Sequence, residues 1–308
     1  MAKLSTIELN MLKAIADLHK IPEGAYNIRA DGVSAGRNST EHIEIVSKTD
    51  KQGIDIRVKP GTKNESVHIP VIISKTGYEE LVYNDFFIGE DCDVTIIAGC
   101  GIHNSGCDVS KHDGVHTFYI GKNSKVKYVE KHYGEGEGTG ERIMNPQTVV
   151  YLEEGASMEM DTTQIRGIDS TKRETVVHAG AGAEIVILEK LMTHDRQSAV
   201  SDMSIHLDGD DARARVISRS VAQDFSTQVF HPNVEGNARC FGHVQCDTII
   251  MGDAKVSSIP AISANHVDAQ LIHEAAIGRI AGDQLLKLMT LGLSEQEAEE
   301  RILAGFLK

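Results

Sequence analysis

The segment Ala183-Glu-Ile-Val-Ile187 follows a glycine, begins with a small residue and then alternates polar with apolar side chains. Alternation with a period of two is typical of a strand whose side chains point to opposite faces. The same arrangement returns along the chain, and the small first residues of successive copies are 32, 32, 27, 29 and 26 positions apart. The other copies are Cys92-Asp-Val-Thr-Ile96, Ser124-Lys-Val-Lys-Tyr128, Ala156-Ser-Met-Glu-Met160, Ala212-Arg-Ala-Arg-Val216 and Ala238-Arg-Cys240.

These copies predict a mainly β protein with a parallel β-helix, or β-solenoid, over residues 67–280. One repeat of this length holds about two strands with their turns, and stacked repeats bury one continuous core. A β-sandwich is the alternative, but its strands would not share a small first residue.

An N-terminal helix and a small lead-in region are expected over residues 1–66. Ser5 and Glu8 have the spacing of a capping box, and the helix should end before Pro22. Apolar residues recur at helical spacing after this start, at Met11, Leu12, Ile15 and Leu18. Residues 42–46 and 54–58 alternate as short strands do.

The pattern changes again over residues 281–308, where two short helices are predicted. Gly292 separates them, and Ser294 with Glu297 forms a second capping box. An apolar stripe follows at Ile302, Leu303 and Phe306. Helices this short are not stable alone, so they dock either on the solenoid of this chain or on a partner.

Composition excludes several classes of protein. A net charge of −14 argues against nucleic acid and against an anionic membrane surface. No apolar run reaches the ~18 residues that a membrane-spanning helix needs, and the N-terminal segment lacks the layout of a signal peptide. Five cysteines, an odd number in a long chain, indicate reduced thiols. A cytoplasmic location is therefore expected.

Two short blocks carry the candidate ligands of a metal or cluster. Cys246 lies in Gln-Cys-Asp-Thr-Ile-Ile-Met-Gly, and His273 with Glu274 lies in Ala-Gln-Leu-Ile-His-Glu-Ala. A thiolate is the preferred ligand of an iron–sulfur cluster, although a lone cysteine in a strand is commonly a small buried apolar residue. Neighbouring residues of a strand point to opposite faces, so His273 and Glu274 reach one site only where the strand bends.

A third group of possible ligands lies within residues 100–116. Cysteines and histidines occur here with loose zinc-like spacing, at Cys100, His103, Cys107, His112 and His116. The polar run 102–114 predicts a loop. No nucleotide-binding Gly-x-x-x-x-Gly-Lys motif and no catalytic triad pattern occurs, so the chain is expected to be no enzyme and to bind no nucleotide of its own.

The two blocks around Cys246 and His273, followed by the helical segment, resemble the C-terminal core of the SufB/SufD family of iron–sulfur cluster assembly scaffolds. In length the chain is similar to the short SmsB-type scaffolds of minimal SUF-like systems. The resemblance implies a right-handed parallel β-helix with Cys246, Glu274 and His273 as ligands of a transient cluster. In SufB-type members the residue before this histidine is Glu, whereas this chain has Ile272.

The resemblance also implies the partners. A SufC-like ABC ATPase would dock on residues 281–308 and gate access to a cluster site at the interface of a scaffold dimer. That dimer would be a homodimer or would pair the chain with a SufD-like paralogue, and sulfur would come from a donor such as a cysteine desulfurase system. The residues expected to contact the ATPase are Gln284, Leu285, Leu293, Leu303 and Phe306.

Two other functions stay open. The chain could be a SufD-like structural subunit without a cluster of its own. It could also be a metal-dependent β-helix enzyme that uses the Cys/His-rich segment 100–116.

Overall fold

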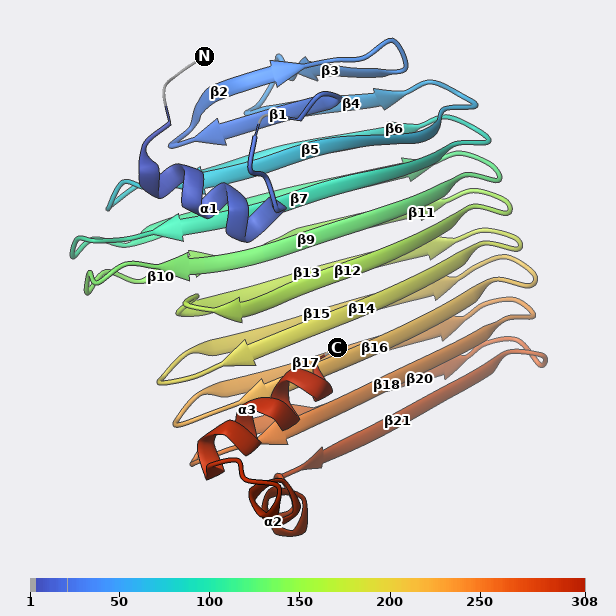
Figure 1. The fold of residues 1–308 in the computed structure, drawn as a ribbon. Coiled ribbons are helices and arrows are strands. Elements are labelled where there is room, and N and C mark those ends of the chain that lie inside the picture. The colour runs from blue at the N-terminus through green and yellow to red at the C-terminus, as the bar shows by residue number, and fades with distance from the viewer. Residues whose placement is uncertain (1–3, 21, 308) are drawn as a thin grey trace.

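The computed structural model, which describes residues 4–20 and 22–307, is a parallel β-solenoid. From residue 63 onward the chain passes back and forth between two facing sheets, so it coils along one axis (Figure 1). Helix α1 (Thr6–Ala16) lies over one sheet near the start of the coil, and α2 (Gly282–Thr290) and α3 (Glu295–Phe306) lie at the other end. The prediction of a β-solenoid from the repeat is confirmed.

Two sheets form the walls of the solenoid, and we call them the first and the second sheet. The first runs, in spatial order, β2 (Val33–Asn38), β1 (Ala25–Ala30), β5 (Lys63–Ile73), β7 (Asp93–His103), β9 (Lys125–Glu135), β12 (Ser157–Arg166), β14 (Glu184–Thr193), β16 (Arg213–Ala222), β18 (Phe241–Ile250) and β21 (Gln270–Gly278). The second runs β19 (Lys255–Ser258), β17 (Thr227–Gly236), β15 (Ser198–Leu207), β13 (Ser170–Ala179), β10 (Arg142–Met144), β8 (Ser110–Ile120), β6 (Glu79–Ile88), β4 (Gly53–Val58) and β3 (Ile43–Ser47). Beside this path, β11 (Gln147–Leu152) pairs with β13 and β8, and β20 (Ala261–Ala264) pairs with β17.

The small residue that starts each repeat occupies a corner of the coil. In the copies that begin at residues 92 to 212 it precedes the first residue of a strand in the first sheet, and its side chain points into the core. In the last copy Cys240, not the predicted Ala238, holds this place before β18. All five of these corner residues from Cys92 to Ala212 are fully buried: Cys92, Ser124, Ala156, Ala183 and Ala212. A larger side chain would have to displace the packed strand ends, which explains why the repeat begins with a small residue.

On several strands the interior changes from apolar side chains at one end to polar side chains at the other. Phe86 and Phe118 stack at 4.2 Å between ring centroids, with Tyr128 edge-on to Phe118 at 5.0 Å. Beyond these rings the inward positions carry buried polar and charged side chains, namely Glu80, Asn84, His112, His116, Glu130, His132, Arg173 and Glu189. Buried groups of this kind need partners within the protein.

The loop predicted for residues 102–114 is wrong, because β8 already begins at Ser110. His112 and His116 therefore lie in a strand, and both side chains are buried. The error has a physical origin. The inward side chains of this strand are themselves polar, so its alternation does not show as a contrast between polar and apolar residues.

Helix α1 has the predicted capping box, with the Ser5 hydroxyl accepting from the Glu8 backbone and the Glu8 carboxylate accepting from the Ser5 backbone. It ends at Ala16, because Asp17 adopts the left-handed conformation, with φ 52°. The helix packs closely on β7. A Cβ atom at Gly99 would lie 2.5 Å from the carbonyl oxygen of Ile15, so only glycine allows this approach.

The far end of the solenoid is open. β21 is the last strand of the first sheet, and its outer edge pairs with no strand among residues 4–20 and 22–307. Helix α3 has the predicted capping box of Ser294 and Glu297, and its end is held to the first sheet where Arg219 donates to the Phe306 carbonyl at 3.3 Å. Within the described chain, no helix has both the length and the apolar character needed to cross a membrane.

Candidate functional site

Cys246 lies inside the last turns of the solenoid. It belongs to the inward-facing residues of β18, and its side chain is 2% exposed. Burial raises the pKa of the thiol, and contacts with Ser258 and Thr248 oppose this rise. Cys246 is therefore a protonated thiol at neutral pH in this conformation, and any metal that binds it must displace the proton.

His273 lies on the same inward face, on the neighbouring strand β21. It is the register partner of Val244, two residues before Cys246 in β18. Its Nε2 atom is buried and has no hydrogen-bond partner. Burial and the nearby His243 lower the pKa of the ring, so the imidazole is neutral and Nε2 can act as a metal ligand.

Glu274 lies on the opposite, outer face of β21. It is the register partner of Gln245, and its side chain is 63% exposed. The carboxylate is 3.4 Å from Nε2 of His243, an outward-facing histidine of β18. The structure thus places Cys246 and His273 on one face and Glu274 with His243 on the other. Sequence reasoning missed His243, because its contact with Glu274 depends on the register of the two strands.

The edge beside these residues exposes apolar side chains. β21 has a free edge, and each residue of the short strand β20 is exposed. Large apolar side chains in these last turns are 42% to 91% exposed, namely Ile259, Ile262, Val267, Ile272 and Ile277. A free strand edge with an apolar surface is a ready place for pairing with another chain.

A second cluster of buried donors lies in the middle of the solenoid, and we call it the Cys100 cluster: Cys100, His112 and His132. Cys100 of β7 and His132 of β9 are register partners in the first sheet, and His112 lies on β8 of the second sheet. Burial acts to raise the pKa of Cys100, but the two imidazoles outweigh it and lower the pKa to about 7. The thiol is therefore partly a thiolate at neutral pH.

Buried charges lie between the two clusters. Arg173 donates to Glu130 at 2.6 Å and approaches Glu189 at 3.8 Å. Glu189 also accepts from the hydroxyl groups of Ser201 and Ser218, both at 2.8 Å. Ser218 is in turn the register partner of Cys246. Polar side chains thus line the interior from the Cys100 cluster to Cys246.

The five ligands suggested by the spacing within residues 100–116 do not come together. His103 contacts Glu135 at 3.2 Å, and Cys107 is exposed in the turn between β7 and β8. His116 accepts from the Asn84 amide at 3.2 Å and contacts the Tyr128 hydroxyl at 2.8 Å. Only Cys100 and His112 of the predicted set meet, and His132 joins them from outside the segment.

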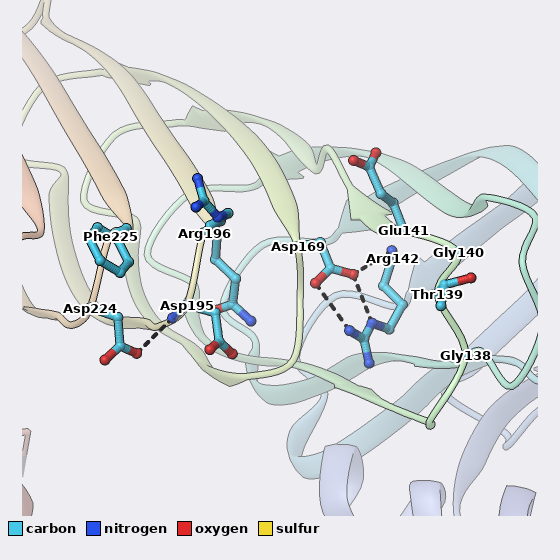
Figure 2. A pocket seen from close by; sticks show the side chains of 11 residues that line it. Gly138, Thr139, Gly140, Glu141, Arg142, Asp169, Asp195, Arg196, Asp224 and Phe225 are labelled. Atoms are coloured by element: carbon cyan, nitrogen blue, oxygen red, sulfur yellow. Dashed lines mark hydrogen bonds and ion pairs between the residues drawn. The ribbon is translucent and has the colours of Figure 1, made fainter.

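A cavity of 660 Å³ lies at one corner of the coil and is open to solvent (Figure 2). Arg142 and Asp169 form a two-pronged ion pair there, with Arg142 Nε 2.9 Å from the carboxylate. His194, Asp195 and Asp224 offer ligand atoms within 4.8 Å of one another in the adjoining turns. Asp224 accepts from the Asp195 backbone at 2.8 Å, as turn residues commonly do.

The apolar side chains of the helical pair α2 and α3 differ in how far they are exposed to solvent. Leu303 is 7% exposed, and Leu285, Leu293 and Phe306 are half-buried, whereas Gln284 is exposed. The large apolar side chains that reach the surface are Leu286, Met289 and Leu291, which are 61%, 40% and 75% exposed.

Comparison with known proteins gives a consistent picture. A family model described as the SufBD core domain of SUF-system FeS cluster assembly matches residues 83–306. An iron-sulfur cluster assembly SufBD family protein of Methanocaldococcus jannaschii is 30% identical over 82% of this chain and 79% of its own. Proteins of the same description from Pyrococcus horikoshii and Archaeoglobus fulgidus are 28% and 26% identical, each over 88% of this chain and over 83% and 72% of their own lengths.

Proposed function

Because the chain belongs to the SufBD family of iron–sulfur cluster assembly proteins, we propose that it is a scaffold on which a cluster is built at Cys246. The observation that carries this proposal is the inward-facing pair at the open end of the solenoid. Cys246 supplies a thiol, and His273 supplies a buried Nε2 atom without a partner. A buried nitrogen without a partner costs free energy, which a bound ligand would recover.

The cluster is the cargo of this site, and it needs about four protein ligands. One chain offers Cys246 and His273 on the inner face, with Glu274 on the outer face of the same edge strand. A second copy paired along β21 would double the donor set about one axis. We therefore propose a homodimer, in which the apolar residues exposed on the last turns are covered. Pairing with a SufD-like paralogue would use the same edge.

A SufC-like ABC ATPase is the proposed partner of the helical pair. Leu286, Met289 and Leu291 form an exposed apolar surface on and just after α2 that the solenoid does not cover. The helical pair touches the solenoid lightly, through contacts such as that of Arg219 with Phe306. Movement of the helices on ATP binding would therefore strain the open end and admit iron and sulfur to Cys246.

Anaerobic reconstitution with ferrous iron and sulfide tests the proposal. We expect the wild-type protein to develop the visible absorption of a cluster and Cys246→Ser to lose it. Cys240→Ser is the matched control, since Cys240 is also a buried free thiol near the open end. His273→Gln should bind less iron. Equal absorption in Cys246→Ser and the wild type would refute the assignment, and absorption in neither protein would favour a structural subunit.

A further inference from the structure

The Cys100 cluster combines three donors of two types, thiol and imidazole, that are common in metal sites. Cys100 is a free thiol with 5% of its surface exposed, and it faces the interior from β7. Its register partner His132 lies one strand away on the same sheet, and His112 approaches from the opposite sheet. The protein thus brings one sulfur and two imidazoles into the same part of a closed core.

His112 is held in the way that metal-binding histidines are held. Its Nδ1 atom is 3.0 Å from the carboxylate of Glu80, which in turn accepts from Arg29 at 2.8 Å. The other ring nitrogen, Nε2, is buried without a hydrogen-bond partner, and the side chain is 3% exposed. A carboxylate on one nitrogen fixes the orientation of the ring and leaves the other nitrogen free for a metal.

His132 differs from His112, because both of its ring nitrogens have a neighbour, and a metal would have to displace one of them. A carboxylate oxygen of Glu130 lies 3.6 Å from its Nε2, and Arg173 approaches its Nδ1 at 3.3 Å. Glu130 is itself fixed by Arg173 and by the Tyr128 hydroxyl, which donates to it at 2.9 Å. The position of the ring is therefore set by a buried network.

We propose that Cys100, His112 and His132 bind one borderline divalent ion of the Fe²⁺ and Zn²⁺ class inside the solenoid, at a site separate from Cys246. A thiolate with two imidazoles suits such ions better than Mg²⁺ or Ca²⁺, which prefer oxygen ligands. The three donor atoms do not all lie within 4.8 Å of one another in the structure. Binding therefore rotates the imidazoles towards the sulfur. It releases to solvent any proton on the thiol and the protons that the raised pKa values of His112, about 10, and His132, about 9, keep on the two rings. Three protein ligands leave a fourth position open.

Titration of the reduced protein with Co²⁺ alone tests this site. We expect one equivalent to give a thiolate-to-cobalt charge-transfer band with the visible bands of a tetrahedral ion, both displaced by Zn²⁺. Cys100→Ser should lose the charge-transfer band, and His112→Gln and His132→Gln should alter the visible bands. Glu80→Gln keeps all three ligands and should weaken Co²⁺ binding about 10- to 100-fold, as loss of a carboxylate behind a ligating histidine typically does.

Two matched controls separate this site from the other thiols. Cys107→Ser removes the exposed thiol of the same segment and should leave the cobalt spectrum unchanged. Cys246→Ser should also keep the spectrum, so this site and the proposed cluster site can fail independently. Absence of a charge-transfer band in the wild type, or its persistence in Cys100→Ser, would overturn the assignment. Circular dichroism checks the fold of each variant, and should Cys100→Ser unfold, unchanged Co²⁺ affinity in Glu80→Gln would count against the site.

Discussion

Glu130, His116 and Arg173 occupy interior positions that an apolar side chain would fill in a simpler solenoid. Burial acts to raise the pKa of Glu130, but His132 and Arg173 outweigh it and hold the pKa well below its ordinary value. His116 is different, because burial dominates and lowers its pKa to about 4. Its neutral form is fixed by Asn84 and Tyr128, which use both ring nitrogens. The interior therefore holds one histidine that must stay uncharged.

His116 should make the protein acid-sensitive between pH 6.5 and about 4. In this window the unfolded chain binds a proton at the ordinary pKa of 6.5, while the folded ring stays neutral down to about 4. The unfolded state then binds more protons, so the free energy of unfolding falls as the pH falls, by up to about 3 kcal/mol from this group. His116→Gln cannot be protonated and should show a shallower decline. Urea unfolding at a series of pH values measures it, with the exposed His19→Gln as control; identical slopes in His116→Gln and the wild type would contradict the expectation.

At the scale of single elements, helix α1 depends on one glycine of the strand beneath it. A methyl group at Gly99 would meet the backbone of Ile15 at 2.5 Å, and backbone cannot move aside as a flexible side chain does. The helix buries Met11, Leu12 and Ile15 in this contact. Its stability therefore comes from packing on the sheet, because a helix of 11 residues is marginal by itself.

Gly99→Ala should loosen α1 and leave the solenoid folded. Hydrogen exchange of the α1 amides should become faster, while the amides of the central strands stay protected. Gly278→Ala is the matched control, because a Cβ atom there meets nothing within 4 Å. Unchanged protection of the α1 amides in Gly99→Ala would contradict this prediction, because it would show that the helix can shift on the strand and stay as stable as before.

The surface of α2 allows a second test at this scale. Leu286→Glu combined with Met289→Glu should weaken binding of the ABC ATPase by about 2 kcal/mol or more, close to 30-fold, because apolar contacts at the centre of an interface dominate its affinity. Thermal stability should not change, since both side chains are exposed. Leu9→Glu, on an equally exposed position of α1, is the control. Undiminished co-purification of the ATPase with the double variant would place its contact elsewhere.

The elements themselves were largely predictable, whereas the sites were predictable only in part. The small residue at each corner and the alternation after it are local signals, so they reveal the solenoid and its approximate turns. The meeting of Cys100 with His132 depends on strand register, and the approach of His112 depends on the lengths of the turns between the sheets. Neither quantity is encoded in residue spacing alone. Cys246 and His273 share a face for the same reason, which the sequence leaves open.

At the scale of the whole molecule, the two ends of the first sheet differ. At the start, β1 and β2 form an antiparallel pair with a register shift between Ile28 and Arg29, and such irregular, short edges resist further pairing. At the other end β21 has nine residues and a free edge. The exposed apolar residues Ile272 and Ile277 lie along it. We therefore expect the proposed homodimer to form at the end that carries β21.

Ile272→Lys together with Ile277→Lys should convert the dimer to a monomer. In the proposed dimer these two exposed side chains become covered, and lysines in their place would put like charges against their copies across the axis. Light scattering during gel filtration measures the mass. Val33→Lys makes the equivalent change on the edge strand β2, where the side chain is 63% exposed, and should leave the mass unchanged. A wild-type protein that is monomeric alone and with the ATPase bound would rule out the proposed assembly.

The open edge of β21 also bears on the order in which the turns of the solenoid fold. During synthesis the strands leave the ribosome in chain order, and each new turn can pair with the one already folded. Every nascent intermediate therefore carries one unpaired growing edge, and that edge advances until β21 is laid down. Only then does the free edge carry His273 beside Cys246. Under the proposed scaffold role, a chain stalled before β21 would still have an edge for pairing but would lack His273, so two such chains that docked would lack part of the proposed ligand set.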